Sequence, residues 1–290
     1  MSERIALGTA QFGLPYGIAN RNGQVAPEAA AAIVDLARSH GVDTADTAIA
    51  YGESESSLGQ IGMSGWRVVS KLPPLPLDCV DAPEWVEQRL HESLARLGLS
   101  RLYGLLLHRP AQLLEGQGSD LYRQLVDVRR RGLVAKIGVS VYEPAELDLL
   151  LPRFALDLVQ APFNVLDRRL ADTGWLTRLH AAGVEVHVRS VFLQGLLLMA
   201  ADDRPAWCRE WQPLWDAWHR WLEQQGASAL DACLAFVLAH AEVDRVIVGV
   251  DSLEQLRGIL ASCTRRVPVA PPSLGSTDPR LINPSKWVTT

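Results

Sequence analysis

The chain of 290 residues has no apolar stretch long enough to cross a lipid bilayer, which takes about 20 consecutive apolar residues in a helix. Its first residues, MSERIALGTAQFG, lack the apolar core and small-residue cleavage site of a secretory signal peptide. We therefore expect neither a membrane-spanning nor a secreted protein. The expected location is the cytoplasm.

Cysteine is scarce, and its spacing excludes two kinds of site. The four cysteines show neither the paired spacing of a zinc site nor the density of a disulfide framework. They are Cys79, Cys208, Cys233 and Cys263. We expect no metal site and no structural disulfide.

The chain also has no excess of positively charged residues. The formal net charge is −5, and the basic residues are dispersed along the chain. The one tight cluster, Arg129 to Arg131, ends a predicted helix, where cations interact favourably with the helix dipole. The charge pattern thus indicates no nucleic-acid partner and no membrane surface as a partner.

A glycine-rich dinucleotide fingerprint is also absent after the first predicted strand. The segment GTAQFG, residues 8–13, lacks the G-x-G-x-x-G spacing that binds a pyrophosphate at a helix start. This absence argues against a Rossmann domain.

What the chain does contain is a regular alternation of short β-rich runs and longer amphipathic segments. In segments 26–41 and 82–98, apolar residues recur at helical spacing and glycine follows the end. The predicted strands are Arg4–Gly8, Val42–Asp46, Arg67–Lys71, Leu102–His108, Ala135–Ser140, Asp157–Gln160, Val184–Ser190 and Arg245–Val248. Eight such repeats predict an α/β fold of the (β/α)8 TIM-barrel class, as one domain over residues 1–290.

Two regions depart from the simple repeat. Leu193–Ala241, between the seventh and eighth strands, is long enough for a loop and two helices, and loops on that barrel face often shape substrate pockets. Residues 268–290 are rich in proline and are predicted to form an irregular tail that packs across the barrel.

Four polar residues stand at or just past the ends of predicted strands. They are Asp46, Tyr51, Lys71 and His108. Each has an ordinary structural explanation when taken alone: a helix cap, a packed ring, a solvated amine or a buried imidazole. Together they follow strands two, three and four, whose carboxyl ends meet at one mouth of a parallel barrel. The sequence therefore predicts a proton-transfer site at that mouth.

The residue types suit this chemistry. A phenol needs roughly 4 kcal/mol of stabilisation of its phenolate to bring its pKa from about 10 to about 7. An ammonium about 4 Å away supplies an interaction of that order at an effective dielectric constant near 20. We expect Lys71 to lower the pKa of Tyr51, Asp46 to keep Lys71 charged, and a neutral His108 to align a carbonyl.

These residues, in VDTADTAIAYGESE, VVSKL and LLLHRP, resemble the aldo-keto reductase superfamily over nearly the whole chain. The resemblance implies a barrel that binds an extended nicotinamide cofactor and reduces an aldehyde or ketone, or runs the reverse oxidation. The resemblance implies that Tyr51 is the general acid and that Lys71 is its partner. It also implies that Asp46 pairs with Lys71 and that His108 orients the carbonyl. We expect no hairpin before the first strand, although one often closes the amino end of barrels in this family.

The same resemblance assigns cofactor contacts. Ser140 and Gln160 match residues that hold the nicotinamide carboxamide, although Val141 replaces the usual asparagine. Arg189 stands where an aromatic ring commonly stacks on the nicotinamide, and its planar guanidinium can also stack. The full set of expected contacts is Thr9, Ser140, Gln160, Arg189, Ser190, Phe192, Gln194, Gly195, Gly249, Asp251 and Gln255.

The segment VIVGVDSLEQLRGIL aligns with the part of the family that grips the adenosine end of the cofactor. Gly249, Asp251 and Gln255 stand where basic residues are frequent, so an acid would lie near the 2′-phosphate of NADP. We expect NADP or NAD to bind, with a relaxed or NAD-leaning preference, unless Arg257 or a neighbouring loop supplies the missing charge.

Five tryptophans recur at intervals of four, four, three and three. They are Trp207, Trp211, Trp215, Trp218 and Trp221. This spacing places most of them on one helix face, which either packs on the barrel or walls a pocket.

Two other functions stay open at this point. A cofactor-binding regulatory or scaffold barrel would explain the altered adenosine segment, and a lyase or epimerase could use Tyr51 and Lys71 without hydride transfer. The partner is a small carbonyl or alcohol compound whose identity the sequence does not give. The oligomeric state is equally open.

Overall fold

Eight parallel strands close into a barrel in the computed structural model, which describes residues 2–287. Each strand pairs with its neighbour in the chain, and the last pairs with the first through Ile5 opposite Val246. The strands are β1 (Ile5–Gly8), β2 (Thr44–Asp46), β3 (Arg67–Leu72), β4 (Leu102–Leu107), β5 (Val134–Ser140), β6 (Leu158–Pro162), β7 (Glu185–Arg189) and β8 (Arg245–Gly249). The predicted (β/α)8 barrel is thereby confirmed.

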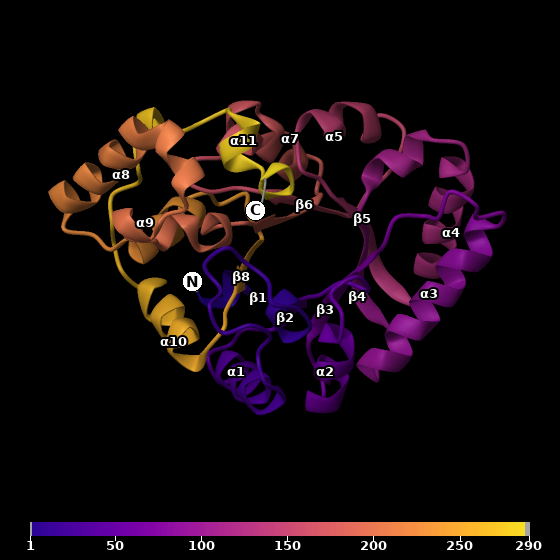
Figure 1. Ribbon diagram of the computed structural model, residues 1–290. Coiled ribbons are helices and arrows are strands. Elements are labelled where there is room, and N and C mark those ends of the chain that lie inside the picture. The colour runs from indigo at the N-terminus through magenta and orange to yellow at the C-terminus, as the bar shows by residue number, and fades with distance from the viewer. Residues whose placement is uncertain (1, 288–290) are drawn as a thin grey trace.

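Helices form an outer ring around these strands (Figure 1). Local sequence signals fix their ends: in α3, for example, Asp81 accepts a hydrogen bond from the backbone N–H of Glu84, and Gly98 adopts the left-handed conformation past the end. The helices are α1 (Pro27–Ser39), α2 (Ser54–Ile61), α3 (Ala82–Leu97), α4 (Gly118–Arg130), α5 (Ala145–Leu150), α6 (Arg169–Asp172), α7 (Trp175–Ala181), α8 (Gln212–Gln225), α9 (Ala229–Leu238), α10 (Leu253–Ser262) and α11 (Pro279–Ile282).

The apolar core lies mainly between the strands and this ring of helices. Inside the barrel a much smaller apolar cluster consists of Val69, Leu106 and Leu158, all fully buried. The carboxyl ends of the strands lie above this cluster and carry polar side chains. The barrel interior thus changes from apolar to polar toward the mouth that the sequence predicts as the site.

A polar cluster connects strands at the amino end of the barrel. Glu185 accepts hydrogen bonds from the hydroxyl of Tyr103 at 2.7 Å and from Nε2 of His187 at 2.7 Å, and it pairs with the ammonium of Lys136. Because β4 and β7 are not neighbours, the bond from Tyr103 to Glu185 crosses the barrel interior. We call Tyr103, Lys136, Glu185 and His187 the floor cluster.

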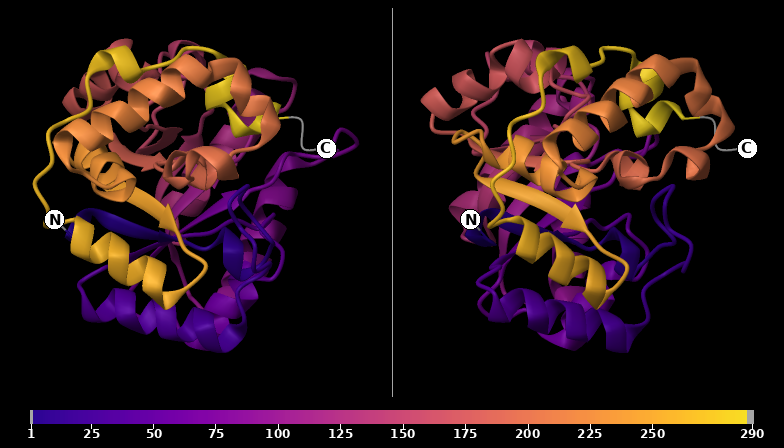
Figure 2. Two further views of the ribbon diagram at one scale, coloured as in Figure 1. Left: turned by 60° about the vertical axis from the view of Figure 1, so that its left-hand side comes forward. Right: turned by 90° about the vertical axis from the view of Figure 1, so that its left-hand side faces the viewer.

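The long connection after β7 holds α8 and α9, as predicted, preceded by three short 3-10 turns. The tail after α10 is less irregular than expected, since it contains α11 and two 3-10 turns. It runs past α8 (Figure 2), and Arg280 of α11 pairs with Glu210, in the 3-10 turn before α8, at 2.6 Å. The last predicted tail residues, 288–290, lie outside the described part of the chain.

No helix within residues 2–287 has the length and apolar character needed to cross a membrane.

Candidate active site

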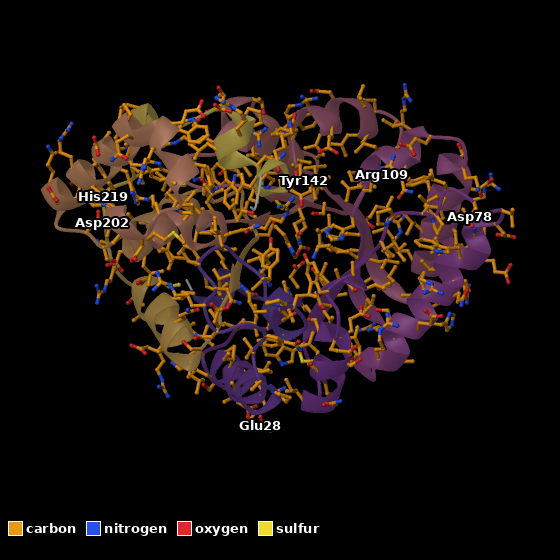
Figure 3. All side chains as sticks on the ribbon, in the orientation of Figure 1. Glu28, Asp78, Arg109, Tyr142, Asp202 and His219 are labelled. Carbon is orange, nitrogen blue, oxygen red and sulfur yellow. The ribbon has the colours of Figure 1, made fainter. Side chains whose placement is uncertain are left out.

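A cavity of about 370 Å³ opens at the carboxyl ends of the strands. The loops that follow β1, β2, β4, β5, β7 and β8 all contribute to its wall. Tyr142, just past β5, lies near the centre of the barrel opening, whereas Asp78 lies at the outer edge of the molecule (Figure 3). The cavity therefore occupies the face on which the sequence places its four polar residues.

An ion pair lies at the base of this cavity. The ammonium of Lys71 donates to both carboxylate oxygens of Asp46, at 2.8 and 2.7 Å, and to the backbone oxygen of Thr47 at 2.9 Å. The Lys71 side chain is only 1% exposed. The amide of Gln160 donates to the same carboxylate at 2.7 Å. All three ammonium protons are thus used, which fixes the lysine in one position.

Tyr51 and His108 lie beside this pair. Tyr51 follows β2 on a turn, and its ring meets the imidazole of His108 edge to face, with 5.9 Å between the ring centres. The Lys71 ammonium lies 5.1 Å from the centre of the Tyr51 ring. The structure therefore brings all four predicted residues together.

The pKa of Tyr51 corrects one expectation. Burial, followed by the charge of Asp46, raises the pKa of Tyr51 above its ordinary value of 10. The predicted lowering of this pKa by Lys71 is wrong for this structure, because burial of the phenol dominates and the carboxylate of Asp46 adds to the rise. The cation that acts against the rise is Arg189. Tyr51 is consequently protonated at neutral pH.

His108 has the opposite shift. Burial and the nearby charge of Lys71 lower the pKa of His108 to about 4. The imidazole is therefore neutral at pH 7, as the sequence interpretation requires. A neutral ring can hydrogen-bond a carbonyl oxygen without competing with the phenol as an acid.

Most of the predicted site residues line the cavity. Those on its wall are Thr9, Asp46, Tyr51, His108, Ser140, Arg189, Ser190, Phe192, Gln194, Gly195, Gly249, Asp251 and Gln255. Lys71 and Gln160 are fully buried behind the wall. Gln160 reaches the site through its partners, since its side-chain oxygen accepts from Ser140 at 3.2 Å while its amide donates to Asp46.

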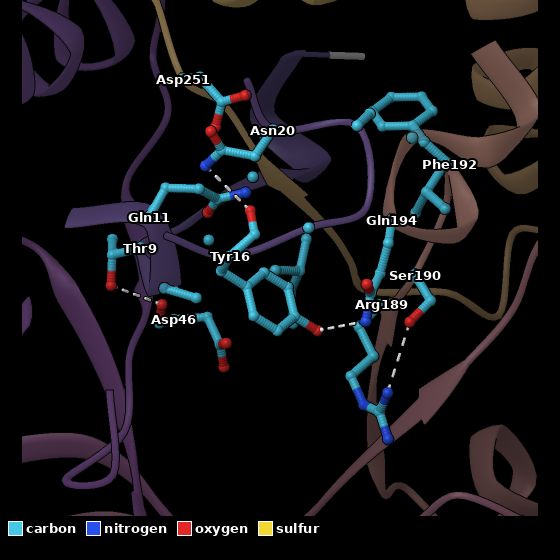
Figure 4. Close-up of a pocket in the computed structure, with 18 of the residues that line it drawn as sticks. Thr9, Gln11, Tyr16, Asn20, Asp46, Arg189, Ser190, Phe192, Gln194 and Asp251 are labelled. Carbon is cyan, nitrogen blue, oxygen red and sulfur yellow. Dashed lines mark hydrogen bonds between the residues drawn. The ribbon is translucent and has the colours of Figure 1, made fainter. Parts of the chain in front are cut away.

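Sequence reasoning missed the long connection between β1 and α1. Its residue Tyr16 lines the cavity and accepts a hydrogen bond from the amide of Gln194 at 3.2 Å (Figure 4). A side chain at Gly195, whose φ is +91°, would lie 2.4 Å from the Cβ of Ala19. The β1 and β7 loops therefore meet across the cavity. The length of this connection, residues 9–26, is the sequence feature that could have indicated its contribution to the cavity wall.

The other end of the cavity is formed by the loop after β8. There Asp251 Oδ1 is buried and has no hydrogen-bond partner among the described residues, and burial raises the pKa of this carboxyl. The backbone N–H of Asp251 donates to the side chain of Gln255 at 2.8 Å. The described lining residues at this end thus include the acidic Asp251 and no lysine or arginine.

The tryptophans pack and do not wall the cavity. Only three of them belong to α8, since Trp207 and Trp211 precede it in a 3-10 turn. Trp215 and Trp218 are almost completely buried, and the ring of Trp207 lies 5.2 Å from that of Trp287 in the tail. The described cavity-lining residues include no tryptophan. The packing alternative is therefore the one that the structure favours.

Within residues 2–287, no group of three or more His, Cys, Asp or Glu side chains is placed to hold a metal ion.

Comparison with known proteins places this geometry in a family. Residues 4–269 match the sequence model described as the Aldo/keto reductase family. A search of curated proteins gave no match.

Among solved structures, PA4992 of Pseudomonas aeruginosa, named as an aldo-keto reductase, is similar at 23% identity and a TM-score of 0.67, over 90% of this chain and 89% of its own. Aldo-keto reductase AKR11C1 of Bacillus halodurans, in its holo form, gives 18% identity and a TM-score of 0.73, over 92% of this chain and 88% of its own. At such identities these likenesses establish the fold.

Proposed function

This chain belongs to the aldo/keto reductase family, and on that premise we propose that it reduces an aldehyde or ketone to an alcohol with NAD(P)H, or runs the reverse oxidation. The observation that carries the proposal is the meeting of Tyr51, His108 and the Asp46–Lys71 pair at one cavity. A scaffold protein has no need for a buried ion pair next to a phenol and a neutral imidazole.

Tyr51 is proposed as the general acid. When bound, the nicotinamide cofactor supplies the hydride that reduces the carbonyl carbon. The carbonyl oxygen then gains negative charge, and an alkoxide is a stronger base than a phenolate. A phenol that stays protonated at neutral pH can therefore give its proton to that oxygen, and its hydroxyl can hydrogen-bond the oxygen beforehand.

The other three residues are proposed to position and support this acid. Neutral His108, edge to face with Tyr51, can hydrogen-bond the same carbonyl oxygen. The Asp46–Lys71 pair fixes the base of the site through four hydrogen bonds that include Gln160 and Thr47. The pair holds these side chains in place, and the charge of Lys71 also helps to lower the pKa of His108.

The cavity fits a nicotinamide nucleotide at two places. Asp251 lines one end of the cavity, where its carboxylate can accept a hydrogen bond from a ribose hydroxyl. Ser140 also lines the cavity, and its hydroxyl can contact the nicotinamide amide. The glycine at 195 allows the β7 loop to meet the β1 loop across the cavity.

We further propose that NAD is preferred over NADP, or that both bind. The carboxylate of Asp251 would repel a 2′-phosphate, whereas it can accept a hydrogen bond from a 2′-hydroxyl. Arg257 is exposed and does not line the cavity, so it supplies no compensating charge at this wall.

The proposed activity is tested by mixing the protein with NADH or NADPH and a panel of aldehydes and ketones. Loss of absorbance of the reduced nicotinamide, dependent on both protein and carbonyl compound, is the expected result. Cofactor binding without turnover of any member of the panel would favour the scaffold alternative. Absence of binding to either nucleotide would favour a lyase or epimerase.

A further inference from the structure

Arg189 is the one lysine or arginine among the described residues that line the cavity. It ends β7, and Figure 4 draws it at the end of the site opposite Asp251. No other charged group of the cavity wall neutralises the positive charge of Arg189. Asp46 is paired with Lys71, His108 is neutral, and Asp251 lies at the far end. The catalytic end of the cavity therefore carries about one net positive charge.

The guanidinium has no acidic partner among the described residues. Its N–H groups donate to the backbone oxygen of Val141 at 3.0 Å and to the hydroxyl of Ser190 at 3.4 Å. A guanidinium has five such donors, so most remain for a ligand. Arg169 offers a contrast, since it makes a two-bond pair with Asp167, at 2.8 Å for each bond.

Stacking fixes the plane of this guanidinium. Its central carbon lies 4.3 Å from the centre of the Tyr142 ring. The ring holds one face by a cation–π contact without using any N–H donor. A planar, partly buried fork of donors with restricted motion matches the geometry of a carboxylate, which it can bind through two parallel hydrogen bonds.

We propose that Arg189 forms a subsite for a substrate carboxylate and that the enzyme acts on carbonyl compounds that also carry one, the oxo acids. The carbonyl oxygen lies between Tyr51 and His108, and the carboxylate of the same molecule pairs with Arg189. This inference rests on the proposed carbonyl reduction and adds the substrate class. The positive charge beside the phenol then acts in two ways, because it binds the anion and opposes the rise in the pKa of Tyr51.

Matched substrates test this subsite. 4-Oxobutanoate and its uncharged amide, 4-oxobutanamide, have the same chain length and differ in the charged group, and the three- and five-carbon homologues probe the spacing. At a saturating concentration of NADH or NADPH, kcat/KM for the best acid should exceed that for its amide by about 10- to 100-fold, which is the contribution of a charge-assisted hydrogen bond.

Variants of Arg189 test whether this residue causes the preference for the acid over the amide. Arg189→Gln should reduce the ratio of acid to amide to within about 3-fold, and Arg189→Lys should retain part of it, since the charge remains and the fork is lost. Because Arg189 lines the cavity proposed to hold the cofactor, the affinity for cofactor is measured for each variant and the nucleotide is kept saturating. Arg109→Gln is the control. Arg109 is exposed, pairs with Glu115 at 2.7 Å, and should leave the ratio unchanged.

A binding measurement separates this inference from the proposed activity. Calorimetric titration with butanoate and butanamide, in the presence of cofactor, should show tighter binding of the acid by the parent protein, and Arg189→Gln should abolish the difference. This result would support the subsite even if no carbonyl compound were reduced. Equal affinity for acid and amide, or a preference for the acid that survives in Arg189→Gln, would overturn it.

Discussion

The ammonium of Lys71 touches both oxygens of Asp46, at 2.8 and 2.7 Å, and lies 5.1 Å from the centre of the Tyr51 ring. Burial lowers the pKa of this lysine, while the carboxylate opposes that effect. The pair is therefore a buried structural contact as well as a neighbour of the proposed acid. The carboxylate thus helps to keep Lys71 charged.

Removing one member of this pair should destabilise the fold. Asp46→Asn leaves the Lys71 ammonium buried beside a neutral group, and breaking a buried pair in this way costs about 3–5 kcal/mol. Urea denaturation followed by tryptophan fluorescence measures the change in the free energy of unfolding.

The control is Asp35→Asn, which removes an exposed pair with Arg38 and should cost less than about 1 kcal/mol. A loss for Asp46→Asn as small as that of the control would show that the buried pair contributes little.

The neutral state of His108 predicts how stability responds to acid. The pKa of His108 is about 4 in the folded chain, below the ordinary value of 6.5 expected after unfolding. The unfolded chain therefore binds the proton first, so the stability that His108 contributes is complete above pH 6.5. It is lost as the pH falls toward 4, at up to about 1.4 kcal/mol per pH unit.

Denaturation curves recorded from pH 7 to pH 4 measure this effect. His108→Gln should show a shallower loss of stability over this interval than the parent protein. Identical slopes for the two proteins would mean that the imidazole is not held neutral by the fold.

The floor cluster should affect the stability of the fold at lower pH than His108 does. Burial opposes the ionisation of Glu185, but hydrogen bonds from His187, Lys136 and Tyr103 together hold the pKa of its carboxyl well below the ordinary range. A depressed pKa contributes stability above about pH 4.5, and this contribution is lost as the pH falls below that value.

Glu185→Gln should therefore be less stable than the parent at pH 7 and should lose less stability between pH 5 and pH 3. Glu254→Gln, at an exposed position of α10, is the matched control and should follow the parent. Parallel curves for the parent and Glu185→Gln would contradict a structural role for the carboxylate.

The nucleotide preference is tested at Asp251. The parent protein should bind NADH at least as tightly as NADPH when both are titrated at equal ionic strength. Asp251→Ser removes the charge that would repel the 2′-phosphate and should improve binding of NADPH by about tenfold relative to NADH. Much tighter binding of NADPH by the parent would contradict the proposal.

The barrel could be predicted from the sequence because its signals are local. Each strand is a short β-rich run, each main helix has its own periodicity and end signals, and the position of one strand does not depend on the others. The four polar residues could be placed for the same reason. A closed parallel barrel brings the carboxyl ends of its strands to one mouth.

The missed features depend on contacts between distant segments. The hydrogen bond between Tyr16 and Gln194 joins residues 178 positions apart, and no local sequence pattern predicts it. The error about the pKa of Tyr51 has a similar origin. Residue types alone placed an ammonium near a phenol, but the burial of the ring and its approach to Asp46 decide the direction of the pKa shift.

The most direct test of the account is the Tyr51→Phe variant, which removes one hydroxyl and keeps the ring beside His108. Cofactor binding, followed by quenching of tryptophan fluorescence, establishes that the variant is folded. With a substrate that the parent protein reduces, kcat should fall by about 10²- to 10⁴-fold, the usual contribution of a general acid. A folded Tyr51→Phe variant with kcat close to that of the parent would contradict the assignment of Tyr51 as the acid.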